Sequence, residues 1–249
     1  MIEAAVDTLN SALSAERAGV GRVELCAALN DAGTTPSAAL IATVCERLEI
    51  PVFALIRPRG GDFLYSRAEL DLMRRDIELA SGFGAVGFAT GALGRDYTID
   101  MDATRSLVSA AGNRPVTFHR AFDFTTDLFA ALEQLIECGV KRVLTSGGAR
   151  TALNGADTIA RLVEQARGRI VVVAGGGVRE NNVREIIDRT GVTEVHARIT
   201  STAAGIEPVV HRGIGLRKPF PDSETAHEEI DEKRMRQFVD LAAFRSTSM

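Results

Sequence analysis

The chain has 249 residues, and its 29 basic and 33 acidic side chains give a formal net charge of −4. Hydrophobic residues make up 45% of the sequence and charged residues 25%, which is ordinary globular composition and excludes a disordered chain, a collagen or a fibrous repeat. The slightly acidic balance gives no reason to expect nucleic acid or a membrane as a partner, and no apolar run approaches the roughly 20 residues of a membrane-spanning helix.

One pattern recurs along the chain: a short apolar run, a polar or glycine-rich loop, and a stretch with helical spacing of apolar residues. The eight runs predicted to be strands are residues 2–6, 22–27, 51–57, 85–90, 115–120, 142–146, 169–174 and 194–198. Helical spacing is clearest in residues 37–48, 68–80, 128–138 and 159–166. Short apolar strands that alternate with helices are typical of parallel β-α-β units.

Eight such units predict a closed (β/α)8 barrel, the TIM barrel. An open doubly wound sheet is the alternative, but that fold usually carries a glycine-rich loop after its first strand. Here the first strand is followed by Asp7-Thr8-Leu9-Asn10, which contains no glycine. We therefore expect one barrel domain over residues 1–249.

The repeating pattern ends after the eighth strand. We expect a barrel core over about residues 2–200, followed by a C-terminal loop and helix over 201–249. Residues 199–222 are predicted to form a long loop over the barrel mouth or at a subunit contact. Residues 223–244 are predicted to form the final helix, with Phe238, Leu241 and Phe244 on one face.

The three cysteines suggest a reduced protein. They are scattered and odd in number, and the first residues carry neither a basic segment nor a long apolar segment. We therefore expect a cytoplasmic location. Cys45 and Cys138 lie in predicted helices and are interpreted as packing residues, while Cys26 is either a small buried hydrophobe or a ligand or reactive thiol.

In this fold, function lies at the C-terminal ends of the strands. Because side chains two residues apart share a face of a strand, Glu24 and Cys26 face the barrel axis if Val23 and Leu25 face the helices. The same argument predicts that one mouth gathers Glu3, Glu24, Cys26, Arg57, His119 and His196. Buried charges need partners, so we expect Glu–Arg or Glu–His contacts among them, which leaves a purely structural reading open.

Two loops have the composition of anion sites. Arg57-Pro58-Arg59-Gly60-Gly61-Asp62 presents two arginines, which suit carboxylate or phosphate, although an internal clamp on Asp62, Glu3 or Glu24 is equally consistent. Gly175-Gly176-Gly177 precedes a helix, where free amides bind anions, but such runs also form tight turns.

Several of these segments together resemble a known family. They are Val-Glu-Leu-Cys at 23–26, the arginine loop continued to Phe63, Thr-Phe-His-Arg-Ala-Phe-Asp at 117–123, Gly-Gly-Gly-Val-Arg at 175–179 and Glu-Val-His-Ala at 194–197. In this order they resemble the CutC copper homeostasis family over about residues 2–200. The resemblance implies a TIM barrel, a cytoplasmic location, a homo-oligomer (dimer or tetramer) and a role in copper binding, trafficking or tolerance.

On this resemblance the expected cargo is Cu(I), with Cys26, His119 and His196 as its ligands. The sequence departs from the family at Ala4 and Ala5, where members often carry cysteine, so Cys26 is left as the one thiol predicted near the mouth. Since Cu(I) favours two or more soft ligands, this departure weakens the case for copper. Arg198 adds a positive charge that favours an anion instead.

The alternative is an enzyme, a lyase, isomerase or hydrolase, acting on a small anionic or phosphorylated metabolite. Its predicted catalytic residues are His119, Glu24, Glu3 and Asp123, because a histidine beside carboxylates suits proton transfer near neutral pH. Its predicted substrate-binding residues are Arg57, Arg59, Asp62, Arg120, Thr145, Ser146, Gly175, Gly176, Gly177 and Arg198. A scaffold without catalysis is a third reading, which the polar mouth argues against.

Overall fold

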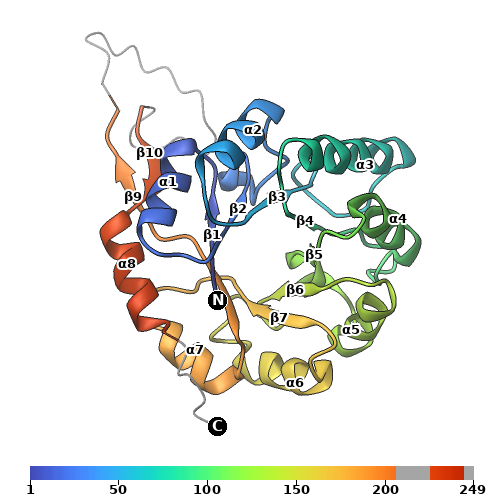
Figure 1. The fold of residues 1–249 in the computed structure, drawn as a ribbon. Helices are drawn as coiled ribbons and strands as arrows, with labels where there is room; N and C mark the ends of the chain where they lie inside the picture. The colour runs from blue at the N-terminus through green and yellow to red at the C-terminus, as the bar shows by residue number, and fades with distance from the viewer. Residues whose placement is uncertain (206–224, 244–249) are drawn as a thin grey trace, which may run out of the picture.

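The computed structural model describes residues 1–205 and 225–243 and shows eight parallel strands closed into a barrel, in the order β1 to β8, with β8 pairing back onto β1 (Figure 1). The predicted (β/α)8 barrel is confirmed. The barrel strands are β1 (Ile2–Val6), β2 (Arg22–Leu25), β3 (Val52–Leu55), β4 (Gly87–Thr90), β5 (Val116–Phe118), β6 (Arg142–Thr145), β7 (Val171–Ala174) and β8 (Glu194–Ala197).

Helices surround this barrel (Figure 1). They are α1 (Leu9–Arg17), α2 (Ala38–Arg47), α3 (Arg67–Gly82), α4 (Met101–Ala111), α5 (Leu128–Glu137), α6 (Ala156–Ala166), α7 (Val183–Thr190) and α8 (Glu232–Leu241). None of the described helices has both the length and the apolar character needed to cross a membrane.

The helix α3 shows how local sequence sets an element. It begins after Ser66, whose hydroxyl accepts from the backbone N–H of Glu69 while the Glu69 carboxylate accepts from the N–H of Ser66. Met73, Ile77 and Ala80 recur at helical spacing and are fully buried. The helix is therefore fixed at its start by a capping box and along its length by packing against the barrel.

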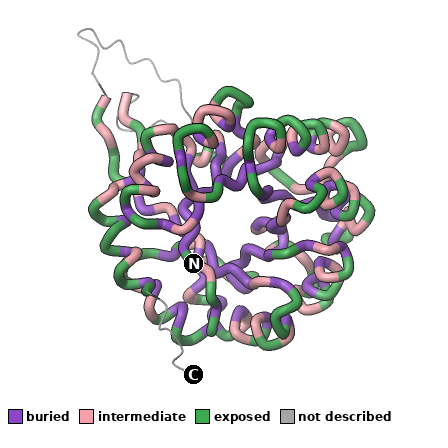
Figure 2. The backbone as a smooth tube through the Cα atoms, viewed as in Figure 1, coloured by how far each residue is buried: buried purple, intermediate pink, exposed green. Residues whose placement is uncertain are grey.

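The strands have two different faces. Val23 and Leu25 belong to the large apolar core between barrel and helices, whereas Cys26 belongs to a small cluster with Leu55 and Ala89. Figure 2 shows the consequence: the strands are mostly buried, and exposed residues concentrate on the outer sides of the helices. The predicted alternation therefore directs Glu24 and Cys26 away from the outer core.

The N-terminal half of the barrel interior is filled by charges. Arg22 donates from Nε to Glu3 Oε2 at 2.5 Å and from Nη2 to Glu194 Oε2 at 2.7 Å. Arg142 donates from Nη2 to the same Glu194 oxygen at 2.8 Å. Both guanidinium groups stack on Phe53, with 4.7 and 5.0 Å between the guanidinium carbons and the ring centroid. Two buried cations thus share two carboxylates and one aromatic ring.

Gly87 provides the space for that ring. A Cβ atom at this position would lie 2.3 Å from the Cζ atom of Phe53, which is held between Arg22 and Arg142. We expect Gly87→Ala to lower the free energy of unfolding by about 3 kcal/mol, because the overpacked ring has no free volume to enter. Chemical denaturation measures this change. Gly82→Ala is the matched control, since its new methyl group meets nothing within 4 Å, and equal losses in both variants would contradict the packing argument.

The C-terminal part differs from the sequence prediction. Two short strands, β9 (Thr200–Ala203) and β10 (His227–Ile230), pair antiparallel beside α1 (Figure 1). The predicted loop over 199–222 therefore starts with a strand, and its residues 206–222 lie outside the described part of the chain.

The predicted final helix over 223–244 was too long. Residues 227–230 form β10, and the helix α8 begins at Glu232 with Asp231 as its N-cap. Pairing with β9 and burial of Ile230 overrode the helical pattern. Phe238 is buried as expected, whereas Leu241 is exposed and Phe244 lies outside the described residues.

Candidate functional site

A cavity of about 160 Å³ lies at the C-terminal mouth of the barrel. Its polar lining consists of Glu24, Arg57, His119, Arg120 and His196. These residues come from β2, β8 and the segments that follow β3 and β5, so the cavity collects side chains from all around the barrel. Catalytic and binding groups of TIM barrels lie at this end.

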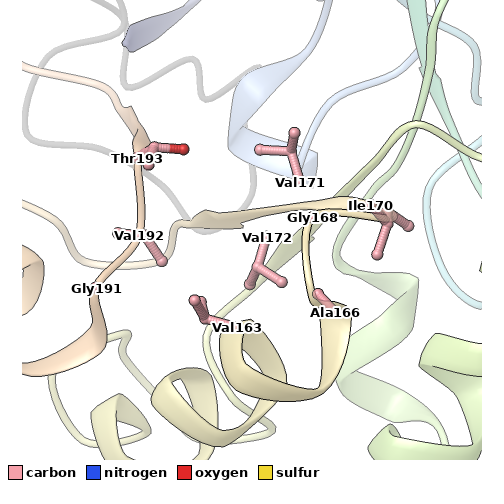
Figure 3. A pocket seen from close by; sticks show the side chains of 9 residues that line it. All are labelled: Val163, Ala166, Gly168, Ile170, Val171, Val172, Gly191, Val192 and Thr193. Atoms are coloured by element: carbon pink, nitrogen blue, oxygen red, sulfur yellow. The ribbon is translucent and has the colours of Figure 1, made fainter.

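A second hollow lies at the other end and has a different character. It measures about 220 Å³ and is lined by residues of α6 and the segments that enter β7 and β8. Figure 3 shows the side chains of Val163, Val172 and Val192 around it. Since its lining contains no titratable side chain, it offers no acid, base or metal ligand.

One wall of the mouth cavity is acidic. The Nδ1 atom of His196 lies 2.8 Å from Glu3 Oε1 and 4.0 Å from Glu24 Oε2. Arg22 holds the other oxygen of Glu3. The ligand atoms of Glu3, Glu24 and His196 all lie within 4.8 Å of one another, and Glu24 Oε2 is buried without a hydrogen-bond partner. We call these three residues the acidic cluster.

Burial and mutual charge set the protonation of the acidic cluster. Burial opposes ionisation of Glu3, but the hydrogen bond from His196 and the charge of Arg22 outweigh it and hold the pKa of Glu3 at about 2. Burial raises the pKa of Glu24, and the charge of Glu3 adds to this while His196 opposes it. Burial also opposes the charge on His196, but the two carboxylates raise its pKa.

Cys26 stands next to the acidic cluster. Its Sγ atom donates to Glu24 Oε1 at 3.5 Å. Burial, followed by the charge and hydrogen bond of Glu24, raises the pKa of this thiol well above its ordinary value. Cys26 is therefore a protonated thiol whose hydrogen is directed at a carboxylate.

The opposite wall carries hydrogen-bond donors. His119 follows β5, which is four strands from β1 in the closed barrel, and its Nδ1 accepts from the N–H of Ala121 at 3.3 Å. Burial and the charge of Arg57 lower the pKa of His119 to about 3, so the ring is neutral and carries its hydrogen on Nε2. That Nε2 atom and Arg57 Nε are both buried without a hydrogen-bond partner. We call His119 and Arg57 the donor wall.

Comparison with known proteins settles the family. Residues 1–201 match the CutC family over most of the chain. The chain belongs to the CutC family. The human copper homeostasis protein cutC homolog is 49% identical over 242 residues, covering 97% of this chain and 89% of the human protein. The family protein CutC of Xylella fastidiosa strain Temecula1 is 47% identical, covering 96% of this chain and 88% of its own.

Solved structures agree with the fold of this CutC-family chain. CutC from Streptococcus agalactiae superimposes with a TM-score of 0.76 at 34% identity, covering 79% of this chain and 97% of that one. The phosphoribosylanthranilate isomerase of Thermotoga maritima superimposes with a TM-score of 0.57 at 14% identity, covering 97% of each chain. The latter likeness concerns the barrel fold alone.

The structure separates the predicted copper ligands of this CutC-family protein. Cys26 and His196 meet around Glu24, whereas His119 lies on the opposite wall. Ala5 also lines the cavity, and it lies beside Glu24 in the pairing of β1 with β2. The expected set of Cys26, His119 and His196 is thus divided between two places, because β1, β2 and β8 are neighbours while β5 lies across the barrel.

Several predicted substrate-binding residues are used within the protein. Arg59 pairs with Glu69 at 2.6 Å and with Asp62 at 2.9 Å, and Arg198 lies 3.8 Å from Asp7. Arg59 and Asp62 therefore clamp the loop after β3, which is the internal alternative that the sequence left open.

The predicted anion residues after β6 surround a carboxylate of the protein itself. Asp123 accepts from the hydroxyl of Thr145, the N–H and hydroxyl of Ser146, and Arg120. The predicted glycine amides are adjacent: Gly175 donates to the carbonyl of Thr145, Gly176 packs against Arg120, and Gly177 packs against Thr151. Asp123 therefore takes the place of an external anion at Thr145, Ser146 and Arg120.

Sequence reasoning did not predict the role of Arg22 and Arg142, which lie toward the N-terminal ends of the strands from the acidic cluster. Arg22 and Glu24 share a strand face by the same alternation that was applied to Glu24 and Cys26, so the signal was present at Arg22. Arg142 similarly starts β6. Arg22 positions Glu3 by holding one oxygen and leaving the other for His196.

Proposed function

We propose that this CutC-family protein binds a copper ion as cargo at the acidic cluster and so serves copper homeostasis in the cytoplasm. The observation that supports it is the buried set of Glu3, Glu24 and His196, whose ligand atoms lie within 4.8 Å of one another and include the unpartnered Glu24 Oε2. The name of the human relative refers to copper homeostasis. A homo-oligomeric state is part of the same proposal.

The chemistry of the donor set bears on the form of copper. One imidazole and two carboxylates suit a divalent ion such as Cu(II), whereas Cu(I) favours sulfur. Cys26 supplies a sulfur atom beside Glu24, but its proton must leave before it binds a metal, and burial with the Glu24 charge opposes that. We therefore propose the acidic cluster as the principal site, with Cys26 as an added ligand for Cu(I).

Copper titration against a competing chelator tests this proposal. We expect one ion per chain and at least a roughly tenfold loss of Cu(II) affinity in Glu24→Gln, because the amide replaces a charged ligand oxygen. Cys26→Ser is expected to retain Cu(II) binding and to lose most Cu(I) binding measured without oxygen.

The control is Glu133→Gln, which removes an exposed carboxylate paired with Arg169 on the outer surface. It should leave copper affinity unchanged. Binding that is not stoichiometric, or that is equally strong in the wild type and Glu24→Gln, would show that the acidic cluster is not the copper site.

A further inference from the structure

Arg57 is a buried cation that has no acidic partner in the described part of the chain. It is 3% exposed, and its guanidinium group donates to backbone carbonyls: Nη1 to Asp31 and Gly33, and Nη2 to Gly61. Arg22 and Arg142, the other buried arginines of the described residues, each pair with a carboxylate. A buried charge without a counter-ion is costly, so the position of Arg57 favours binding of an anion from outside the chain.

Two unused donors show where such an anion would sit. Within the described part of the chain, Arg57 Nε and His119 Nε2 are buried without a hydrogen-bond partner, although the Tyr65 side chain lies beside Arg57, and Arg57 and His119 both line the mouth cavity. Leaving a buried donor unpaired costs about 1–3 kcal/mol, so two of them on one wall are a poor arrangement for an empty structural core. A carboxylate accepts two hydrogen bonds and supplies the missing negative charge.

The cavity suits a small ligand. Its volume is about 160 Å³, which accommodates a molecule with three or four carbon atoms. Leu55, Leu144 and Phe63 complete the lining and provide apolar contact for a short carbon chain.

The acidic cluster, across the cavity from the donor wall, favours a ligand with a second polar group. Glu24 lines the same cavity, and its buried Oε2 atom has no hydrogen-bond partner among the described residues, so it accepts a hydrogen bond when ionised or donates one when protonated. A ligand held by its carboxylate at the donor wall would present its next carbon toward Glu24. A hydroxyl or carbonyl group on that carbon satisfies the remaining unpartnered atom.

We propose that the mouth cavity binds a small 2-hydroxy or 2-oxo carboxylic acid, with its carboxylate on Arg57 and His119 and its second oxygen facing Glu24. This inference goes beyond the proposed copper function because the ligand's carboxylate is held by the donor wall, which the copper proposal does not use. Glu24 belongs to both sites, whereas Arg57 and His119 serve the acid alone.

Calorimetric titration of the full chain with pyruvate, with lactate and with inorganic phosphate tests the inference. We expect saturable binding of pyruvate or lactate to the metal-free wild type. His119→Leu and Arg57→Lys are expected to weaken this binding at least tenfold, because each removes one unpartnered donor. His119→Gln should recover most of it, since its amide nitrogen replaces Nε2. Arg169→Lys is the control on the outer surface and should bind like the wild type.

Further readouts keep the test decisive. If a donor-wall variant does not fold, ring 15N resonances of His119 in the wild type must still shift on addition of pyruvate. Copper affinity should survive in folded Arg57→Lys, which separates failure of this inference from failure of the copper proposal. The inference is overturned if the wild type shows no saturable binding of either acid, if phosphate binds more tightly than both, or if both folded donor-wall variants bind normally.

Discussion

Replacement of Glu3 by glutamine is expected to lower the free energy of unfolding by about 3–5 kcal/mol, because it leaves buried charge uncompensated. Glu3 is 1% exposed and serves both Arg22 and His196. After the change, Glu194 alone must balance Arg22 and Arg142. Thermal unfolding should show a fall in midpoint of about 10 °C for a chain of this length.

A double variant separates charge balance from general disruption. Glu3→Gln combined with Arg22→Met removes one charge of each sign and leaves Arg142 paired with Glu194. We expect the double variant to be more stable than Glu3→Gln alone, because deleting a whole buried pair costs less than deleting half of it. If the loss of stability in the double variant equals the sum of the losses in Glu3→Gln and Arg22→Met measured singly, the ion pair does not account for the effect.

Glu3 also makes the stability of the folded protein depend on pH. The pKa of Glu3 falls from an ordinary 4.5 to about 2 on folding, so its carboxylate binds fewer protons in the folded state. Its contribution to stability is fully present above pH 4.5 and is lost as the pH falls through about 2. Wild type and Glu3→Gln should therefore converge in stability on acidification.

Asp123→Ala is expected to lower the free energy of unfolding by about 3 kcal/mol or more. The carboxylate accepts from the hydroxyl of Thr145 at 2.5 Å, from the N–H of Ser146 at 3.0 Å and from the N–H of Gly148 at 3.1 Å. It also pairs with Arg120 at 2.8 Å. Alanine leaves the Thr145 hydroxyl and the N–H groups of Ser146 and Gly148 without this acceptor and removes the ion pair of Arg120, which keeps its bond to Ser146 Oγ. Chemical denaturation measures the cost.

Asp123→Asn is the comparison variant, because asparagine keeps one acceptor oxygen. It should be more stable than Asp123→Ala and less stable than the wild type. Unchanged stability in Asp123→Ala would contradict a structural role. The hydrogen bonds of Asp123 are directed at the segment after β6, so its carboxylate ties that segment to the segment after β5. Among the residues proposed for proton transfer, Glu24 has the unpartnered oxygen at the cavity and Asp123 does not.

Much of the barrel could be predicted because the patterns of apolar residues that specify its strands each extend over only a few positions. Apolar runs at regular intervals specify strands, and alternation within a run specifies which side chains leave the outer core. Thus Glu24, His119 and His196 were assigned to the mouth, and the structure places them on its cavity. The eight repeated units, with no glycine-rich loop after the first strand, favoured a closed parallel barrel over an open sheet.

Other features depend on which strands become neighbours. Glu3 and His196 meet because barrel closure brings β8 against β1, although 193 residues separate them. Closure also places His119, which follows β5, on the other side of the barrel from Cys26. It brings Asp123 within hydrogen-bond distance of the donors that follow β6. Tertiary pairing likewise turned residues 227–230 into a strand.

The sequence by itself favoured the barrel over an open sheet and predicted the inward face of the strands that carry Glu24, His119 and His196, together with the end of the barrel at which polar groups gather. The tertiary structure alone decided which of those groups are paired and which are left free, as Arg59 and Arg57 show. The physical reason is range: alternation and helical spacing act over a few residues, whereas the partner of a buried charge is fixed by the geometry of a closed barrel.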